Sequence, residues 1–240
     1  MIIRKLTIIS CIGVLLFVTL GHTEASSTSY SKESIIKQIR THQKKIALTF
    51  DDGPDPRYTP AILKILQEHG AKGTFFVIGQ KAKAKPEILK TMVKNQDEIG
   101  NHTFFHHLSR NIDISDIEQC EDIIFSITQQ HTHLFRPPGG YLSENIVKNA
   151  MAAHYKIVMW SWDEDTRDWS RPGVKKIIDR VLNHISPGDI VLFHDGGGNR
   201  RQTVQALPLI LDGLKEKGYQ CVTVSELIHA EEPLKGHKLK

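Results

Sequence analysis

Two adjacent carboxylates and a histidine pair are the residues of this sequence whose types and spacing could do chemistry together. Asp51 and Asp52 follow the apolar run 46–50, and adjacent carboxylates repel each other unless a cation or a shared proton is present. His102 and His106 are four residues apart, which on a helical turn lets both rings face one metal ion. The alternatives are a turn for Asp-Gly-Pro and a structural role for a single histidine. Together Asp52, His102 and His106 predict a catalytic site for zinc, cobalt, nickel or manganese, with positions open for water and substrate.

Further residues could complete a hydrolytic site around that metal. Arg136 could be a surface arginine, or its guanidinium could hold a carboxylate in place across the strand ends. Gly139 follows two prolines, allows a close backbone approach to a ligand, and could stabilise an oxyanion through its N–H. His194 could be a core histidine, or a general acid that Asp168 orients. His107 is an alternative metal ligand, adjacent to one member of the histidine pair.

The elements that must position these residues alternate between strand and helix along the chain. Polar clusters follow five successive predicted strands, and in parallel α/β barrels active sites form at that edge. About 195 residues remain after the leader and linker, which is short for eight full units, so we expect an α/β fold with about seven parallel strands in a distorted (β/α) barrel, as a single catalytic domain. The expected strands are 46–50, 74–78, 98–100, 134–135, 156–162, 189–193 and 219–224, and the expected helices are 32–40, 60–69, 86–95, 115–130, 143–153, 174–184, 203–217 and a short one capped by Ser225.

The ends of the chain differ in composition from its middle. Residues 1–25 have a basic start, an apolar run and small residues at the end, as in a secretory signal peptide, with an uncleaved anchor as the alternative. We expect a linker with a short helix at 26–43, the domain at 44–230 and a basic tail at 231–240. This organisation predicts a secreted or cell-surface protein.

Composition and cysteine content indicate one ordinary globular domain. The chain has 240 residues, is 40% hydrophobic, and carries a formal net charge of +4. Such a mild basic excess is compatible with an anionic cell wall, and we expect a monomer with no nucleic-acid partner. Cys11 lies in the leader, and Cys120 and Cys221 are expected to be buried free thiols rather than a disulfide.

Five motifs of the chain occur in a recognisable order. They are Thr49-Phe50-Asp51-Asp52-Gly53-Pro54, His102-Thr103-x-x-His106, Arg136-Pro137-Pro138, Asp165-x-x-Asp168-Trp169 and Leu192-Phe193-His194. These motifs resemble those of the polysaccharide deacetylases, carbohydrate esterase family 4 with its NodB homology domain, and the chain is similar to bacterial peptidoglycan and chitooligosaccharide N-acetylglucosamine deacetylases. The resemblance covers residues 45–227.

The resemblance implies a role for each matching residue. It makes Asp51 the catalytic base, positioned by Arg136, and His194 the general acid, tuned by Asp168. The same resemblance assigns the metal to Asp52, His102 and His106, with zinc the expected ion, and the substrate contacts to Pro138, Gly139, Trp169 and Leu192. The chain departs from many members in having His107 where they have proline, and Gly139-Gly140-Tyr141 where they have tyrosine. The chemistry is therefore better determined than the substrate.

The expected reaction is metal-dependent removal of N-acetyl groups from an acetylated glycan. N-acetylglucosamine in peptidoglycan or a chitin-like oligomer is the expected substrate, with acetylxylan O-deacetylation as the alternative. A metal phosphoesterase is a different class, and the sequence shows no second full ligand set for a two-metal site. A non-catalytic wall-binding protein would not need Asp51, Arg136 and His194.

Overall fold

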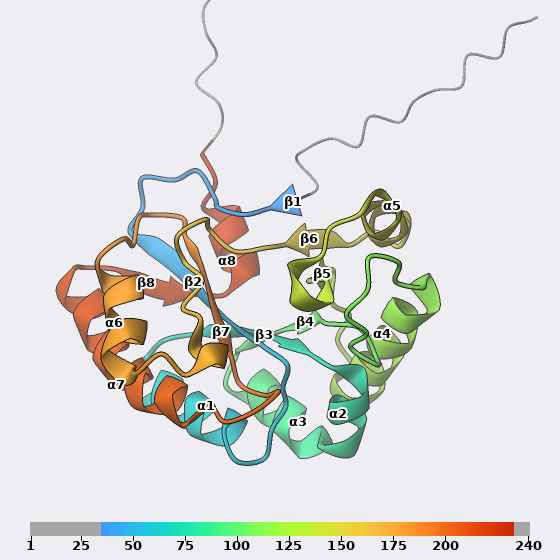
Figure 1. Ribbon diagram of the computed structural model, residues 1–240, viewed down its shortest axis with the longest axis horizontal. Coiled ribbons are helices and arrows are strands. Elements are labelled where there is room, and N and C mark those ends of the chain that lie inside the picture. Colours follow the sequence, from blue (N-terminus) through green and yellow to red (C-terminus); the bar gives the residue numbers. More distant parts are fainter. Residues whose placement is uncertain (1–34, 233–240) are drawn as a thin grey trace, which may run out of the picture.

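A computed structural model describes residues 35–232 of the chain (Figure 1). The expected leader at 1–25, the first part of the expected linker, and residues 233–240 of the expected tail lie outside this range. Between residues 35 and 232, no helix is both long and apolar enough to cross a membrane.

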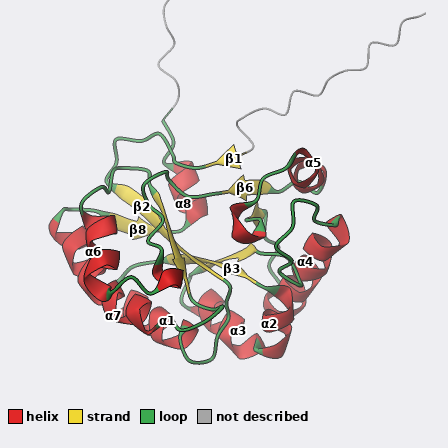
Figure 2. Ribbon diagram, viewed as in Figure 1, coloured by secondary structure: helices red, strands yellow, loops and turns green. Residues whose placement is uncertain are grey.

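Strands and helices alternate along most of the described chain, as the sequence predicts. Figure 2 shows the helices arranged around the outside of the strands. The strands are β1 (Ile35–Ile36), β2 (Lys45–Asp51), β3 (Gly73–Val77), β4 (Glu98–Asn101), β5 (Leu134–Phe135), β6 (Lys156–Val158), β7 (Ile190–His194) and β8 (Gln220–Val222). The helices are α1 (Thr59–Glu68), α2 (Gly79–Ala84), α3 (Pro86–Lys94), α4 (Ile114–Thr128), α5 (Glu144–Ala152), α6 (Val174–Leu182), α7 (Arg201–Glu216) and α8 (Val224–His229).

The strands form one parallel sheet that curls into a distorted barrel. Their order is β1-β6-β5-β4-β3-β2-β7, and β8 pairs with the first half of β2. A non-regular segment closes the barrel between β6 and β7, where Ser161 N–H donates to Ile190 O (3.0 Å) and Leu192 N–H donates to Glu164 O (2.9 Å). The predicted fold class is thus confirmed. The barrel is distorted at this junction between β6 and β7, which we call the seam, because a non-regular segment takes the place of a strand there.

The structure corrects the expected helix at 32–40. Ile35 and Ile36 instead form β1, which pairs in parallel with Ile157 and Val158 of β6. These β-branched residues satisfy an edge of β6 that would otherwise present unpaired backbone groups. The sheet therefore includes residues before the expected start of the domain at 44.

Several element boundaries also differ from those predicted. The strand expected at 156–162 ends at Val158, because the chain then crosses towards β7. Helix α8 is capped by Thr223 in a capping box rather than by Ser225, and α4 is capped by Asp113, whose side chain accepts from Ser115 N–H. Helix α2 was not predicted, because six residues are too few to show a periodic pattern.

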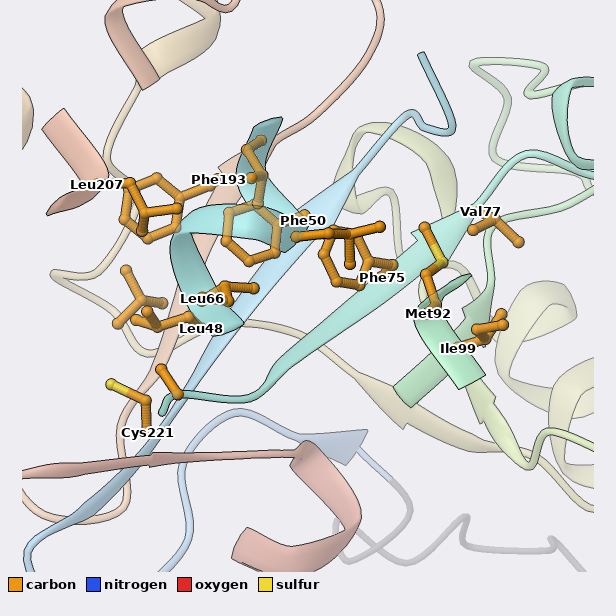
Figure 3. Packing of buried hydrophobic residues seen from close by; sticks show 14 of the residues in the cluster. Leu48, Phe50, Leu66, Phe75, Val77, Met92, Ile99, Phe193, Leu207 and Cys221 are labelled. Carbon is orange, nitrogen blue, oxygen red and sulfur yellow. The ribbon is translucent and has the colours of Figure 1, made fainter. Parts of the chain in front are cut away.

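Alternation along β2 separates the core from the barrel interior. Phe50 packs outside the sheet, where its ring stacks on Phe75 (centroids 4.9 Å apart) and Phe193 (5.5 Å), beneath residues of α1 and α7 (Figure 3). Thr49 and Asp51 have the opposite parity and face the interior. Cys120 and Cys221 are buried free thiols, as predicted. The same strand thus anchors the core and carries a polar residue to the barrel mouth.

Replacing Phe50 with Ala should lower the free energy of unfolding by about 3–5 kcal/mol, because it removes a fully buried ring from the centre of three stacked phenylalanines. Phe125→Ala is the matched control, and this partly exposed ring on α4 should cost less than about 1 kcal/mol. Urea unfolding of both variants measures the difference. Equal losses would contradict the central position assigned to Phe50.

Candidate active site

The C-terminal ends of four strands bring most of the sequence-predicted residues to one mouth of the barrel. Asp51 ends β2, His102 follows β4, Arg136 follows β5 and His194 ends β7. Strands β2 and β7 pair so that Asp51 lies directly beside His194. The parallel sheet therefore places residues from distant parts of the sequence within reach of one another.

Asp52, His102 and His106 form a compact ligand set. Asp52 Oδ1 lies 2.9 Å from His106 Nε2 and 3.6 Å from His102 Nε2. One donor atom from each residue lies within 4.8 Å of the other two. Among the described residues, no other histidine, cysteine or acidic cluster meets this criterion.

The hydrogen bond on the far side of His102 prepares its ring for a cation. Its Nδ1 lies 2.7 Å from Arg136 O, and because a carbonyl only accepts, Nδ1 must carry the proton. In the neutral ring Nε2 then presents a lone pair towards Asp52 Oδ1, which is also an acceptor. A divalent cation satisfies both atoms, and a set of two imidazoles and a carboxylate suits zinc and similar ions.

Electrostatics agree with a negatively charged Asp52. Burial raises the pKa of this carboxyl, but hydrogen bonds with His102 and His106 and charge interactions with His102 and His194 outweigh burial and hold the pKa well below its usual range. The surroundings of Asp52 therefore favour its carboxylate form, which is the form that can bind a metal.

The backbone that presents these ligands is not helical, contrary to the predicted helical turn. Thr103 and His106 have φ values of 65° and 60°, and Asp52 has 72°, all in the left-handed region that non-glycine residues rarely adopt. Asn101 Oδ1 accepts from Thr103 N–H (2.9 Å), and Thr103 Oγ1 accepts from His106 N–H (3.0 Å). These bonds hold a strained loop in the one shape that makes the two rings converge.

His107, the alternative ligand in the sequence, lies outside the set. Its exposed ring stacks on Phe105, with centroids 5.4 Å apart. The structure therefore selects His106 over His107 as the second imidazole.

Arg136 holds Asp51 from inside the barrel. Its Nη1 donates to Asp51 Oδ1 (2.8 Å) and to Thr49 Oγ1 (2.8 Å), while Nε and Nη2 donate to Val158 O (2.9 Å) and Met159 O (3.0 Å). The guanidinium is fully buried, so a fixed positive charge compensates the buried carboxylate. Asp51 Oδ2 is left on the side of the ligand set.

His194, beside Asp51 at the same mouth, is held by Asp168. Its Nδ1 lies 2.7 Å from Asp168 Oδ1, while Asp168 Oδ2 accepts from His194 N–H (2.9 Å) and Thr203 Oγ1 (2.7 Å). Burial lowers the pKa of His194, but the hydrogen bond and charge of Asp168, with Asp51 and Asp52, raise it above its usual value. Burial raises the pKa of Asp168, and its bonds to His194 and Thr203 lower it overall. Nε2 of a protonated ring remains available to donate.

The predicted substrate-binding residues surround this mouth at different depths. Pro138 is buried, and Gly139 is exposed with φ 64° in the 3-10 turn η2 (Pro138–Gly140). Trp169 is 54% exposed in the 3-10 turn η3 (Asp168–Ser170), and Leu192 is buried on β7. Asp165, the first residue of the motif Asp165-x-x-Asp168-Trp169, is not one of these predicted substrate-binding residues.

Sequence reasoning missed several residues that support the site. Lys81 Nζ donates to the carbonyl of Asp52 (2.7 Å), and Thr203 bonds Asp168. Asp195 is buried behind the mouth, accepts from Thr59 Oγ1 (2.5 Å), and burial raises its pKa to about 7. Lys81 and Thr203 lie on helices remote in sequence, and no spacing signal links them to the site.

Comparison with known proteins gives a consistent result. Residues 38–158 match the family model for polysaccharide deacetylases. A peptidoglycan-N-acetylglucosamine deacetylase of Bacillus cereus is 46% identical over 196 residues, covering 80% of this chain and 91% of the relative. A chitooligosaccharide deacetylase of Sinorhizobium fredii is 37% identical over 194 residues, covering 75% and 89%.

Solved structures show the same similarity. The crystal structure of a peptidoglycan N-acetylglucosamine deacetylase in complex with a substituted benzamide has a TM-score of 0.78 and 33% identity, covering 84% of this chain and 96% of that chain. A wild-type pseudoenzyme of carbohydrate esterase family 4 from Bacillus anthracis has a TM-score of 0.75 and 30% identity, covering 84% and 71%. Because this fold also occurs in a pseudoenzyme, the side chains at the mouth must carry any conclusion about activity.

His102→Ala should weaken Zn²⁺ binding by more than about 100-fold, because loss of groups that merely orient a metal ligand already costs about 10–100-fold. His107→Ala should bind Zn²⁺ like the unmodified protein, since its ring points away from the ligand set. Titration calorimetry with Zn²⁺ compares the two. An equal loss in both variants would show that the ligand set is assigned wrongly.

Proposed function

Because this chain belongs to the polysaccharide deacetylase family, we propose that it hydrolyses the acetamide of N-acetylglucosamine residues in peptidoglycan or a chitin-like oligomer. One observation carries the proposal: the Asp52, His102 and His106 set shares one mouth of the barrel with a carboxylate fixed by Arg136 and an imidazole fixed by Asp168. Amide hydrolysis needs such an arrangement, because one group must accept a proton from water and another must give one to the departing nitrogen.

Asp51 is the group suited to accept the proton. Its Oδ1 is occupied by Arg136, while Oδ2 lies 3.8 Å from His102 Nε2, on the side where the metal would be held. A divalent ion bound there, for which we propose zinc, would polarise the acetyl carbonyl and make a water more acidic. The N–H of Gly139 is the candidate hydrogen-bond donor to the acetyl carbonyl oxygen, which becomes negatively charged when water attacks the carbonyl carbon.

His194 is the group suited to give the proton. An amine leaves poorly unless it is protonated, and the raised pKa of His194 keeps the ring protonated above the usual histidine range. We assign the acetyl methyl pocket to Trp169 and Leu192, the half-exposed and buried apolar groups on the same wall. All these residues come from one chain, which supports action as a monomer, and the wall polymer as substrate supports a location outside the cell.

The alternatives are less well supported. Only one three-ligand cluster occurs in residues 35–232, whereas two-metal phosphoesterases need a second. Cleavage of the acetyl esters of acetylxylan would use the same groups. The preference for an N-acetylated glycan over acetylxylan therefore rests on the relatives, which are peptidoglycan and chitooligosaccharide deacetylases. A binding protein without activity has no use for a buried Arg136 and Asp51 pair.

The experiment that tests the proposal measures acetate release from chitohexaose, peptidoglycan and acetylxylan, beside hydrolysis of a phosphatase substrate. Each assay uses protein that is stripped of metal and then restored with Zn²⁺. We expect acetate release from chitohexaose and peptidoglycan, and only after the metal is restored. Activity confined to acetylxylan or to the phosphate ester would replace the proposal.

Asp51→Asn should reduce kcat for acetate release by about 100-fold or more, because the amide cannot accept the proton of water, as is typical for loss of a general base. Asp122→Asn, an exposed carboxylate on α4, should leave kcat unchanged. Zn²⁺ content should equal that of the unmodified protein in both variants. Full turnover by the Asp51 variant would rule out its assignment as base.

Asp168→Asn should move the alkaline limit of activity to lower pH by about one unit or more, because an opposite charge at this distance raises a pKa by about 1–3 units. The sign follows from the raised pKa of His194: without Asp168, burial lowers that pKa, so the ring loses its proton at lower pH. The dependence of kcat on pH measures the shift. An unchanged alkaline limit with reduced kcat would indicate a structural role for Asp168.

A further inference from the structure

All three tryptophans of the chain lie within residues 160–169, in the loop that joins β6 to α6 (Figure 2). Trp162 is 93% exposed, so its indole makes almost no contribution to the folded core. Tryptophan is highly buried on average, and a large exposed aromatic surface is characteristic of binding sites. Trp162 is therefore the strongest feature of the described surface that the catalytic site does not explain.

Trp162 borders a groove with a volume of about 670 Å³. This volume is within the range of about 300–1,000 Å³ found for sites that hold small ligands. Met159, Trp160 and Trp162 give the groove apolar and aromatic surface, and Arg180 and His184 of the α6 region line it as well. A combination of flat aromatic faces and hydrogen-bonding side chains matches a sugar ring, which has apolar C–H faces and polar hydroxyls at its edge.

The charges of the groove favour a neutral ligand. Lys37, Arg167 and Arg180 are basic, and Asp163 and Asp165 are acidic, so the two signs nearly balance. A polyanion such as a nucleic acid would instead require a clear excess of basic groups. Hydroxyl groups can use both signs, because carboxylates accept from them and cationic groups donate to them.

The groove begins where the wall of the catalytic site ends. Trp160 Cη2 lies 2.5 Å from the position that a Cβ on Gly140 would take, so the indole packs directly against the turn that contains Gly139. The guanidinium of Arg136 lies 5.8 Å from the Trp160 ring and donates to Met159 O (3.0 Å). One polymer could therefore contact both the catalytic mouth and the groove.

The loop that carries Trp162 is also held firmly. Backbone hydrogen bonds join Ser161 to Ile190, and Glu164 and Thr166 to Leu192, so the segment runs along β7 at the seam of the barrel. A platform that is ordered before binding does not lose this conformational freedom when a ligand arrives.

We propose that this groove is a further glycan subsite, in which Trp162 stacks on a sugar ring that lies two or more residues along the polymer from the N-acetylglucosamine that is being deacetylated. The proposal rests on the proposed function, because it takes the occupant to be the same polymer. It makes Trp162 a residue that selects for chain length and leaves the chemistry at Asp51 and His194 unaffected.

The test compares chitohexaose with chitobiose as substrates of Trp162→Ala. KM for chitohexaose should rise about tenfold, equivalent to about 1.4 kcal/mol, while kcat and all constants for chitobiose stay unchanged. Trp162→Phe, which keeps an aromatic face, should recover most of the affinity. Leu209→Ala, which removes another exposed apolar side chain on α7, is the matched control and should change neither substrate. The melting temperature should be the same in all variants.

Two results would overturn the subsite. One is an unchanged KM for chitohexaose in Trp162→Ala, and the other is an equal rise for both substrates. If the unmodified protein releases no acetate, the proposed function fails, and binding of chitohexaose by calorimetry then tests the subsite on its own. Equal binding by the unmodified protein and Trp162→Ala, or binding by neither, would exclude it.

Discussion

The buried guanidinium of Arg136 is the interaction on which the rest of the site depends. Its three nitrogens bond Asp51 and Thr49 of β2 and the carbonyls of Val158 and Met159, while its own carbonyl accepts from His102. One residue therefore orients the candidate base, fixes the tautomer of a candidate metal ligand, and ties together three strands. A displacement of Arg136 would disturb every one of these functions at once.

Such a charge is expensive to bury and explains the composition of the barrel interior. A buried ion pair is stable only when all of its remaining hydrogen-bonding groups are satisfied. Here Thr49 and the two carbonyls accept from three of the four N–H groups that Asp51 leaves free, and the centroid of the Phe76 ring lies 4.1 Å from Cζ of the guanidinium. The aromatic and aliphatic core outside the sheet supplies the stability that this polar interior does not.

The sequence predicted what depends on strand ends and missed what depends on long-range packing. Asp51, His102, Arg136 and His194 were identified because each follows or ends a strand, and parallel strands end at one edge. The two-residue strand β1 forms only because β6 offers an edge, so no local pattern encodes it. The convergence of the histidines was predicted, but a helical turn was the wrong reason, because left-handed backbone at Thr103 and His106 cannot be inferred from spacing.

The division between interior and rim separates chemistry from specificity in this molecule. The residues proposed to move protons are buried or half-buried and bonded on several sides, so they tolerate little change. Trp162, the residue proposed to contact the rest of a glycan, is 93% exposed on a loop and makes few contacts within the protein. A pseudoenzyme with the same fold shows that the barrel persists without activity. Substitutions in such loops would therefore change the preferred polymer without altering Arg136 and its partners, in keeping with the proposal that the rim selects the substrate.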